Sequence, residues 1–349
     1  LYMGRRLNPG ATDTPSLVVN TGEYDPATGR SYFEIGMQGT SQQKSQQMGS
    51  LELRGRQLSG LQLVTSHVDA ADTETGVFDG VDTSINGLLS YERDASSNFS
   101  GLLADLQLAA ADALSQYDPL DPQALIPKLA DGLEIARAAR AAARAADTQR
   151  LLDEKIEEFV SALMLAAGVS IDALADAETV VPGSTLTVAA RVFRPESSPV
   201  RLTDVRLSLP SDWKASPSNA EGLPNERGYR RRDQADEEFL YGVQVPADAK
   251  PTQPYWLELP REGAAYDWSA AGNAQNQPFA APLMMAVATL HIGNAQVTVE
   301  KEVEYRVVDR IRGEIRRRID VVPAVSVEPA ADLLVVPASS DRKRHELLL

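Results

Sequence analysis

The chain has 349 residues, enough for two or three domains of ordinary size, and 43% of them are hydrophobic, which is ample for packed cores and excludes wholesale disorder. It carries 34 basic and 49 acidic residues, and the resulting formal net charge of −15 disfavours nucleic acids and anionic membrane surfaces as partners. Cysteine is absent, which excludes disulfides, thiolate-bound zinc and a thiol nucleophile, and no apolar run is long enough to span a bilayer.

Composition divides the chain into successive zones. Residues 1–84 are rich in Gly, Ser and Gln, residues 85–168 are rich in Ala and Leu and indicate helix, and residues 169–320 alternate with the period of β-strands. In residues 321–349 we expect the start of a second β-sandwich, with VVPAVSVEP as its first strand. Since the chain starts at Leu1 and stops within a strand pattern, we expect a fragment of a longer protein.

The first zone contains a conspicuously polar segment, GRSYFEIGMQGTSQQKSQQMG, from Gly29 to Gly49. Four glutamines lie between Ser41 and Gln47. Such a run fits a flexible linker, the polar face of a helix or the rim of a ligand pocket. Its spacing alone favours the helix face.

Three helices are expected in the second zone, packed as a hairpin or small bundle. The first follows the N-cap candidates of residues 82–84, the second follows Asp121–Pro122, and the third follows Asp147–Thr148 and stops at Gly168. Pro127 either kinks the second helix or moves its start to its own position.

Two groups of arginines stand out by their spacing. Arg137, Arg140 and Arg144 form one basic stripe on an alanine-rich helix, and this is a solvated face or an anion-binding stripe. The run of residues 230–232 is followed at once by acidic residues, so its charge is balanced and a solvated loop is expected.

The third zone contains short strand candidates at residues 188–193, 205–209 and 239–245. The clearest pattern is AQVTVEKEVEYRVVD, in which apolar residues from Val297 to Val307 share one face and charged residues the other. A sheet with one buried face and one solvent-exposed face is typically antiparallel. With turn signals between the strands, the pattern predicts an immunoglobulin-like β-sandwich.

Residues alone indicate no self-contained active site. The histidines His67, His291 and His345 lie far apart, and no GxGxxG, Walker, HExxH or GxSxG motif occurs. His67 has Asp69 and Asp72 nearby, but a hydrolytic zinc site needs about three protein ligands, and a surface loop histidine is the ordinary interpretation.

Aromatic residues of the β zone suggest a function of another class. Exposed rings could stack on sugars, whereas beside prolines such residues often anchor cores or loops. The candidates are Trp213, Tyr255, Trp256, Tyr266 and Trp268. One hypothesis is therefore an exported β-sandwich that binds carbohydrate or acts as a spacer, with no enzymatic activity.

Several segments, in order, resemble the C-terminal region of large bacterial PIG-L (LmbE-like) zinc-dependent N-deacetylases. They are GEYDPATGRSYFEIGMQGTSQQKSQQMGSLELRG, VFDGVDTSINGL, IDALADAETVVPGSTLTV, VPADAKPTQPYWLELPREGAAYD and YRVVDRIRGEIRRRIDVVPAVSV, which together cover almost the whole chain. In that family a Rossmann-like α/β catalytic domain carries a zinc signature of the AHPDDE kind and a later histidine motif. Neither occurs here.

The resemblance implies that residues 1–84 are the C-terminal remnant of the deacetylase domain, followed by the helical segment and the β-sandwich. The family's H-R-S-Q segment matches residues 43–46, with glutamine in place of histidine. The implied substrate-proximal edge consists of Ser41, Gln43, Ser45 and Gln46.

The chemistry implied for the parent protein is zinc-assisted hydrolysis of N-acetyl groups. Zinc polarises the acetamide carbonyl and activates its bound water, with a carboxylate as general base. The implied substrates bear N-acetylglucosamine, and the implied location is outside the bacterial cytoplasm. No catalytic or metal role falls on a residue of this chain, so we expect the fragment alone to be inactive.

Overall fold

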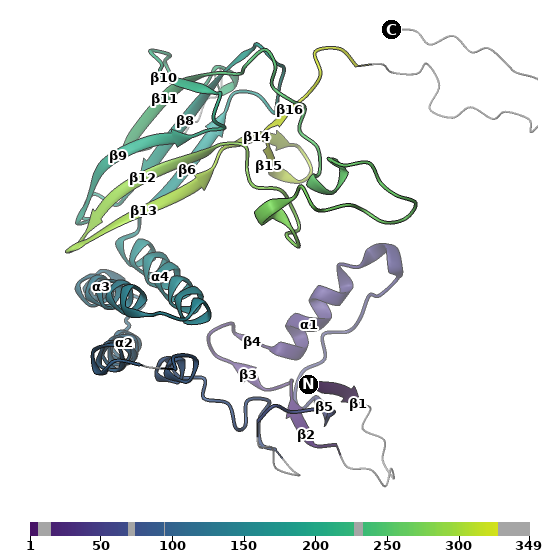
Figure 1. The fold of residues 1–349 in the computed structure, drawn as a ribbon, viewed down its shortest axis with the longest axis vertical. Helices are drawn as coiled ribbons and strands as arrows, with labels where there is room; N and C mark the ends of the chain where they lie inside the picture. The colour runs from purple at the N-terminus through teal and green to yellow at the C-terminus, as the bar shows by residue number, and fades with distance from the viewer. Residues whose placement is uncertain (6–14, 69–73, 94, 227–232, 327–349) are drawn as a thin grey trace, which may run out of the picture. The chain divides into compact units, whose positions relative to one another are not determined.

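A computed structural model describes residues 1–5, 15–68, 74–93, 95–226 and 233–326. The protein is a mixed α/β chain with several sheets (Figure 1). It divides into two compact units, Leu1–Ser90 and Tyr91–Leu349. Among the described residues, no helix has the length and apolar character needed to cross a membrane.

Unit 1 contains a three-stranded antiparallel sheet in the order β1-β5-β2, a short hairpin and the helix α1. Its elements are β1 (Tyr2–Arg5), β2 (Leu17–Asn20), β3 (Tyr24–Asp25), β4 (Arg30–Ser31), α1 (Tyr32–Ser41), η1 (Lys44–Gln46) and β5 (Leu58–Leu63). A Rossmann-like layer is built from parallel strands, whereas the described strands of this unit pair antiparallel.

Unit 1 buries very little apolar surface. Among its described residues, Leu17 is the one hydrophobic side chain in the buried class. By contrast, Leu51, Val64 and Phe78 leave more than half of their surface exposed. A sheet of three strands normally needs a hydrophobic face packed on something to be stable. This unit therefore has almost no hydrophobic core of its own.

The helical part of unit 2 consists of η2 (Ile85–Tyr91), which straddles the unit boundary, α2 (Ser97–Ser115), η3 (Pro122–Leu125), α3 (Ile126–Ala142) and α4 (Ala146–Ala167). Gly168 ends α4 with a φ of 68°, which confirms the predicted stop. Pro127 lies in the first turn of α3, after the 3₁₀ turn that begins at Pro122. The second helix thus begins at Ile126, one residue before Pro127, so the second of the two predicted alternatives is nearly correct.

The predicted start of the first helix is wrong by one element. Asp82 accepts a hydrogen bond from the Ser84 N–H at 2.9 Å, and Ser84 Oγ accepts one from the Gly87 N–H at 3.1 Å. These caps begin the 3₁₀ helix η2, not α2. The N-cap of α2 is Ser96, whose hydroxyl accepts from the Phe99 N–H at 3.2 Å.

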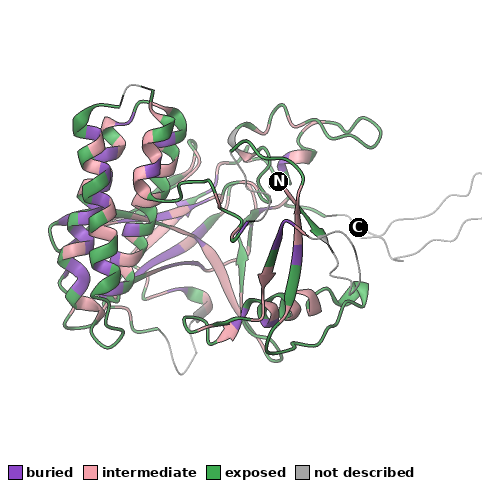
Figure 2. Cartoon of the chain, turned by 90° about the horizontal axis from the view of Figure 1, so that it is seen from below, coloured by how far each residue is buried: buried purple, intermediate pink, exposed green. Residues whose placement is uncertain are grey.

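The three α-helices pack around a shared apolar centre, where their buried faces turn toward one another (Figure 2). Leu103, Leu133 and Leu152, one from each helix, are fully buried. Arg140 on α3 makes two hydrogen bonds to Asp153 on α4, at 2.8 and 3.1 Å. The predicted arginine stripe therefore includes a residue that ties two helices together.

Two open sheets face each other across a common core in the rest of unit 2. One has the order β10-β11-β8-β6-β14-β15 and the other β13-β12-β9. Their strands are β6 (Ser170–Ala175), β8 (Thr185–Phe193), β9 (Val200–Ser208), β10 (Lys214–Pro217), β11 (Glu237–Gln244), β12 (Met285–Ile292), β13 (Ala295–Glu302), β14 (Glu304–Asp309) and β15 (Gly313–Arg318). Val188, Val243 and Ala286 are fully buried between the sheets.

Two features of this sandwich differ from the predicted antiparallel pattern. The AQVTVEKEVEYRVVD run is divided at Val303, and β13 and β14 belong to opposite sheets. Val303 is almost fully buried where the chain passes from one sheet to the other. The alternation of apolar and charged residues in the sequence is therefore not interrupted at this corner. In addition, β14 pairs with β6 in parallel, over only two residue pairs.

The second sandwich predicted for residues 321–349 falls largely outside the described residues. Asp320–Val321 forms β16, which pairs in parallel with β7 (Thr179–Val180). Val321 is buried in the core of the first sandwich.

Candidate functional site

The helix α1 of the polar segment is held at its N-terminus by a capping box. Ser31 Oγ accepts from the Glu34 N–H at 3.3 Å, and the Glu34 carboxylate accepts from the Ser31 N–H at 3.0 Å. Arg54 Nε adds a bond to Glu34 at 3.0 Å. The Ser31 N–H, the Ser31 hydroxyl and Arg54 together hold the pKa of Glu34 below its usual value.

Ser41, the first residue of the predicted substrate-proximal edge, is occupied by backbone contacts. Its hydroxyl donates to the Met37 carbonyl at 2.9 Å and accepts from the Ser50 N–H at 3.1 Å. Arg30, which precedes the helix, makes hydrogen bonds to Gln38 in α1 at 2.7 Å and to Glu52 at 2.8 Å, and so links the same two segments. These contacts fasten residues 50–54 along α1.

The other three predicted residues lie together just beyond α1. Ser45 and Gln46 are in the 3₁₀ turn η1, Gln43 is its N-cap, and all three are exposed. Among the described residues, their side chains have no hydrogen-bond partner, so their amides and hydroxyl are available to a ligand. Gln47 then turns the chain with a φ of 55°, a left-handed conformation that is uncommon for a residue other than glycine.

The described residues contain no group of three or more His, Asp or Glu side chains that could hold a metal ion. His67 is exposed, and the neighbouring Asp69 and Asp72 lie outside the described residues. His291 lies in β12, opposite Gln296. His345 and the arginine run of residues 230–232 also lie outside them. The described side chains thus do not fit a zinc centre, which needs about three protein ligands.

The aromatic candidates are buried to different degrees. Trp213 packs against the sandwich core, and Tyr255 is buried with its hydroxyl donating to the Gln277 carbonyl at 2.8 Å. Trp268 packs edge-on against Tyr255 at 6.1 Å between ring centroids. Trp256 and Tyr266 keep part of their surface exposed. Trp213, Trp256 and Trp268 are each partly buried, so Tyr266, at 44%, is the most exposed of the five candidates.

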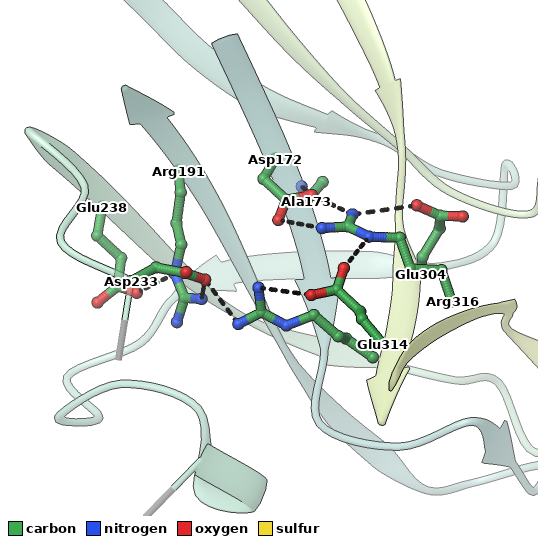
Figure 3. Close-up of polar contacts among 9 residues, drawn as sticks. Asp172, Ala173, Arg191, Asp233, Glu238, Glu304, Glu314 and Arg316 are labelled. Atoms are coloured by element: carbon green, nitrogen blue, oxygen red, sulfur yellow. Dashed lines mark hydrogen bonds and ion pairs between the residues drawn. The ribbon is translucent and has the colours of Figure 1, made fainter. Parts of the chain in front are cut away.

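A network of arginines and carboxylates crosses the outer surface of the six-stranded sheet (Figure 3). Arg316 on β15 reaches over β14 to Asp172 on β6, with hydrogen bonds of 2.6 and 2.9 Å. It also bonds Glu314 at 2.7 Å and Glu304 at 3.3 Å. Because β6 and β14 share so short a parallel ladder, these bonds supplement a weak part of the sheet.

The same network continues around a buried arginine. Arg191 on β8 has only 4% of its side chain exposed and pairs with Glu238 at 2.7 Å and Asp233 at 3.2 Å. Asp233 also pairs with Arg306 at 2.6 Å. Every one of these arginines meets a carboxylate, as a buried charge requires. We therefore interpret the network as structural, even though a pocket of about 450 Å³ opens beside it.

The pKa of Asp172 reflects this arrangement. Burial raises it, but the hydrogen bonds and the charge of Arg316, together with the charge of Arg306, outweigh burial, and the net shift is downward. The carboxyl therefore stays ionised in the folded chain at neutral pH.

Sequence reasoning missed Phe279 and Arg318. Phe279 is 65% exposed, and the Arg318 guanidinium lies 5.1 Å from the centre of its ring. The two residues are far apart in the chain, so no local spacing connects them. An available signal was the aromatic residue between prolines in the PFAAP segment.

Comparison of the chain with protein-family models and with curated proteins gave no match.

Proposed function

We propose that this chain is the non-catalytic C-terminal part of a PIG-L-like, zinc-dependent N-deacetylase that acts on N-acetylglucosamine-bearing substrates outside the bacterial cytoplasm. In this proposal unit 1 is the closing part of a Rossmann-like catalytic domain, and the sandwich of unit 2 is immunoglobulin-like. The zinc ligands are supplied by polypeptide that precedes Leu1.

The observation that supports the proposal best is the missing core of unit 1. Its described residues include one buried hydrophobic side chain, Leu17, alongside many exposed ones. Burying an apolar side chain of this size stabilises by about 1.5–3 kcal/mol, so a folded unit with almost no such burial calls for an additional packing partner. The remainder of a catalytic domain would provide that partner.

The polar end of α1 supports the same proposal. The capping box and the Ser41 tether fix the direction in which the chain leaves the helix, and Gln43, Ser45 and Gln46 follow as exposed hydrogen-bonding groups. The left-handed backbone conformation of Gln47 in the turn costs about 1 kcal/mol or more. In the assembled domain these side chains would line the rim of the pocket and bind the substrate's hydroxyl or acetamide groups.

The test compares this chain with a longer protein that includes the upstream reading frame. The chain alone is expected to bind no stoichiometric zinc and to release no acetate from N-acetylglucosamine, whereas the longer protein does both. Stoichiometric zinc on the chain alone would refute the proposal. So would an upstream frame that encodes a signal peptide running directly into Leu1.

Substitutions in the longer protein then test the edge residues. Gln46→Ala is expected to lower kcat/KM for acetate release about tenfold, because one hydrogen bond to substrate is lost. Gln42→Ala is the matched control, because Gln42 is also exposed but lies outside the four-residue match. Equal effects of the two substitutions on kcat/KM would remove Gln46 from the substrate edge.

A second candidate function is a carbohydrate-binding or spacer module with no enzymatic activity. It is favoured by exposed aromatic residues of unit 2, and Phe279 is the most accessible of those that the structure describes.

A further inference from the structure

Two adjoining hollows form a groove at the end of the sandwich, which we call the Phe279 groove. One hollow, of about 410 Å³, is lined by Trp256, Pro254 and parts of residues 279–283 and 318–322. The other, of about 340 Å³, is lined by residues 277–282 with Ala274 and Arg318. Both are lined by residues 279–282 and Arg318, so the two hollows adjoin along this shared lining, which includes the contact between Phe279 and Arg318. Each hollow has the size of an ordinary small-ligand site.

The walls of the Phe279 groove are fixed in place by hydrogen bonds. The Thr252 N–H donates to the Val321 carbonyl at 2.8 Å, and Thr252 Oγ1 accepts from the Val321 N–H at 2.9 Å. Arg318 donates to the Ala280 carbonyl at 2.9 Å and pairs with Glu302 at 3.0 Å. A groove with tethered walls binds without a large ordering cost.

The lining of the groove combines aromatic rings with both hydrogen-bond donors and hydrogen-bond acceptors. Trp256 and Phe279 offer rings, and Phe279 keeps 65% of its surface exposed although it is large and apolar. Arg318, a hydrogen-bond donor only, is two residues from Asp320, an acceptor when ionised, and both are exposed. Gln253, exposed on the same lining, can donate and accept.

From this combination we propose that the Phe279 groove binds a neutral, β-linked oligosaccharide of gluco-configured rings. Such rings carry their hydroxyls around the edge and leave an apolar C–H face, which stacks on an aromatic ring. Each hydroxyl both donates and accepts, so it satisfies Arg318 and Asp320 alike. The acidic balance of the chain, −15, disfavours anionic polysaccharides.

A proline-rich peptide is the other ligand that aromatic grooves commonly bind. Its backbone offers carbonyl acceptors but few N–H donors, because proline has none. Asp320 would then face the ligand without a donor, so the lining favours the oligosaccharide. This inference does not rest on the deacetylase proposal, and it gives the second candidate function a site and a ligand class.

The test titrates the full chain separately with cellotetraose, chitotetraose and hexaproline, followed by calorimetry and by ligand-observed NMR. One of the two oligosaccharides is expected to bind. Phe279→Ala, at an exposed position that does not endanger folding, is expected to weaken that binding about tenfold, as loss of one stacking ring does. Trp256→Ala should act in the same direction, with its fold checked by circular dichroism.

Tyr266→Ala is the matched control, because Tyr266 is a partly exposed ring, 44% accessible, that lies outside the groove lining. It should leave the affinity unchanged. The proposal is overturned if neither oligosaccharide binds, if Phe279→Ala binds as tightly as the parent chain, or if hexaproline binds in their place. Zinc content and acetate release take no part in these measurements, so failure here is separate from failure of the deacetylase proposal.

Discussion

At the scale of single residues, one arginine–carboxylate pair joins two strands that are not neighbours in the sheet. Arg316 and Asp172 are separated by a whole strand, yet they form a two-point contact with the Asp172 side chain only 12% exposed. A charge buried to that degree is costly unless paired, so removing either partner leaves the other uncompensated. The alternation of the sequence indicated which residues face outward, but it could not indicate that this outer face would be partly covered.

We predict that Arg316→Ala lowers the free energy of unfolding by about 2–3 kcal/mol, the cost of losing hydrogen bonds to a charged group and leaving Asp172 unpaired. Arg312→Ala is the control, because its pair with Asp309 is exposed and contributes about 0–1 kcal/mol. Urea unfolding followed by tryptophan fluorescence, to which Trp213 on the sandwich core contributes, measures both. Equal losses in the two variants would show that the network adds nothing beyond ordinary surface pairs.

The same pair predicts a pH dependence of stability. Because the folded pKa of Asp172 is below its unfolded value of 3.8, its contribution is fully present above pH 3.8 and is lost as pH falls through the lower folded value. Asp172→Asn is therefore expected to be less stable than the parent chain at neutral pH, with the gap closing in acid. A gap between their urea midpoints that is constant from neutral pH to below 3.8 would contradict this assignment.

At the scale of elements, helix ends were largely readable from the sequence because their signals are local. Gly168 ends α4 where the left-handed conformation is needed, and Pro127 fits the first turn of α3. The N-cap of α2 was missed, because residues 82–84 carry the same capping chemistry and precede it. The division of one alternating run into β13 and β14 was not readable either, since alternation is the same on both sides of the corner at Val303.

The contact between α3 and α4 yields a prediction that helix propensity alone would get wrong. A Cβ added at Gly132 would lie 2.4 Å from Cε1 of Phe159, so the ring would have to move in a packed interior. We expect Gly132→Ala to destabilise by about 1–3 kcal/mol, although alanine is the better helix former. Thermal unfolding followed by the helical circular dichroism signal measures the effect.

Gly101 provides the matched control in α2. A Cβ there would meet no atom within 4 Å, and the position is exposed. Gly101→Ala is therefore expected to stabilise by about 0.5–1 kcal/mol. If the two substitutions shift the melting temperature in the same direction, the close approach of Phe159 to Gly132 is not a constraint on packing.

At the scale of the whole molecule, burial is distributed very unevenly between the two units. The buried hydrophobic residues of the described chain lie almost entirely in unit 2, in the helices and between the sheets (Figure 2). Composition could not reveal this, because residues 1–84 contain enough apolar residues for a core. The candidate edge at residues 41–46 came from the resemblance, whereas the Phe279 groove needed the fold, which brings distant segments together.

The uneven burial predicts unequal local stability. We expect backbone amides of the β1-β5-β2 sheet to exchange with solvent at least about tenfold faster than those of β6 and β8, because few apolar contacts oppose local opening in unit 1. Hydrogen exchange read by mass spectrometry on the intact chain measures this directly. Comparable protection in the two sheets would show that unit 1 is stabilised by means other than a core.

The arginines of β15 have one more consequence. This strand is at the end of its sheet in the described structure, where unpaired backbone groups could recruit a strand from another molecule. Arg316, Arg317 and Arg318 follow one another along it, and each is held by a carboxylate, Asp172, Glu178 and Glu302 respectively. Charged side chains along an edge strand disfavour the addition of a strand from another molecule. The arginines that pair with carboxylates of the sandwich thus also oppose aggregation through the edge strand β15.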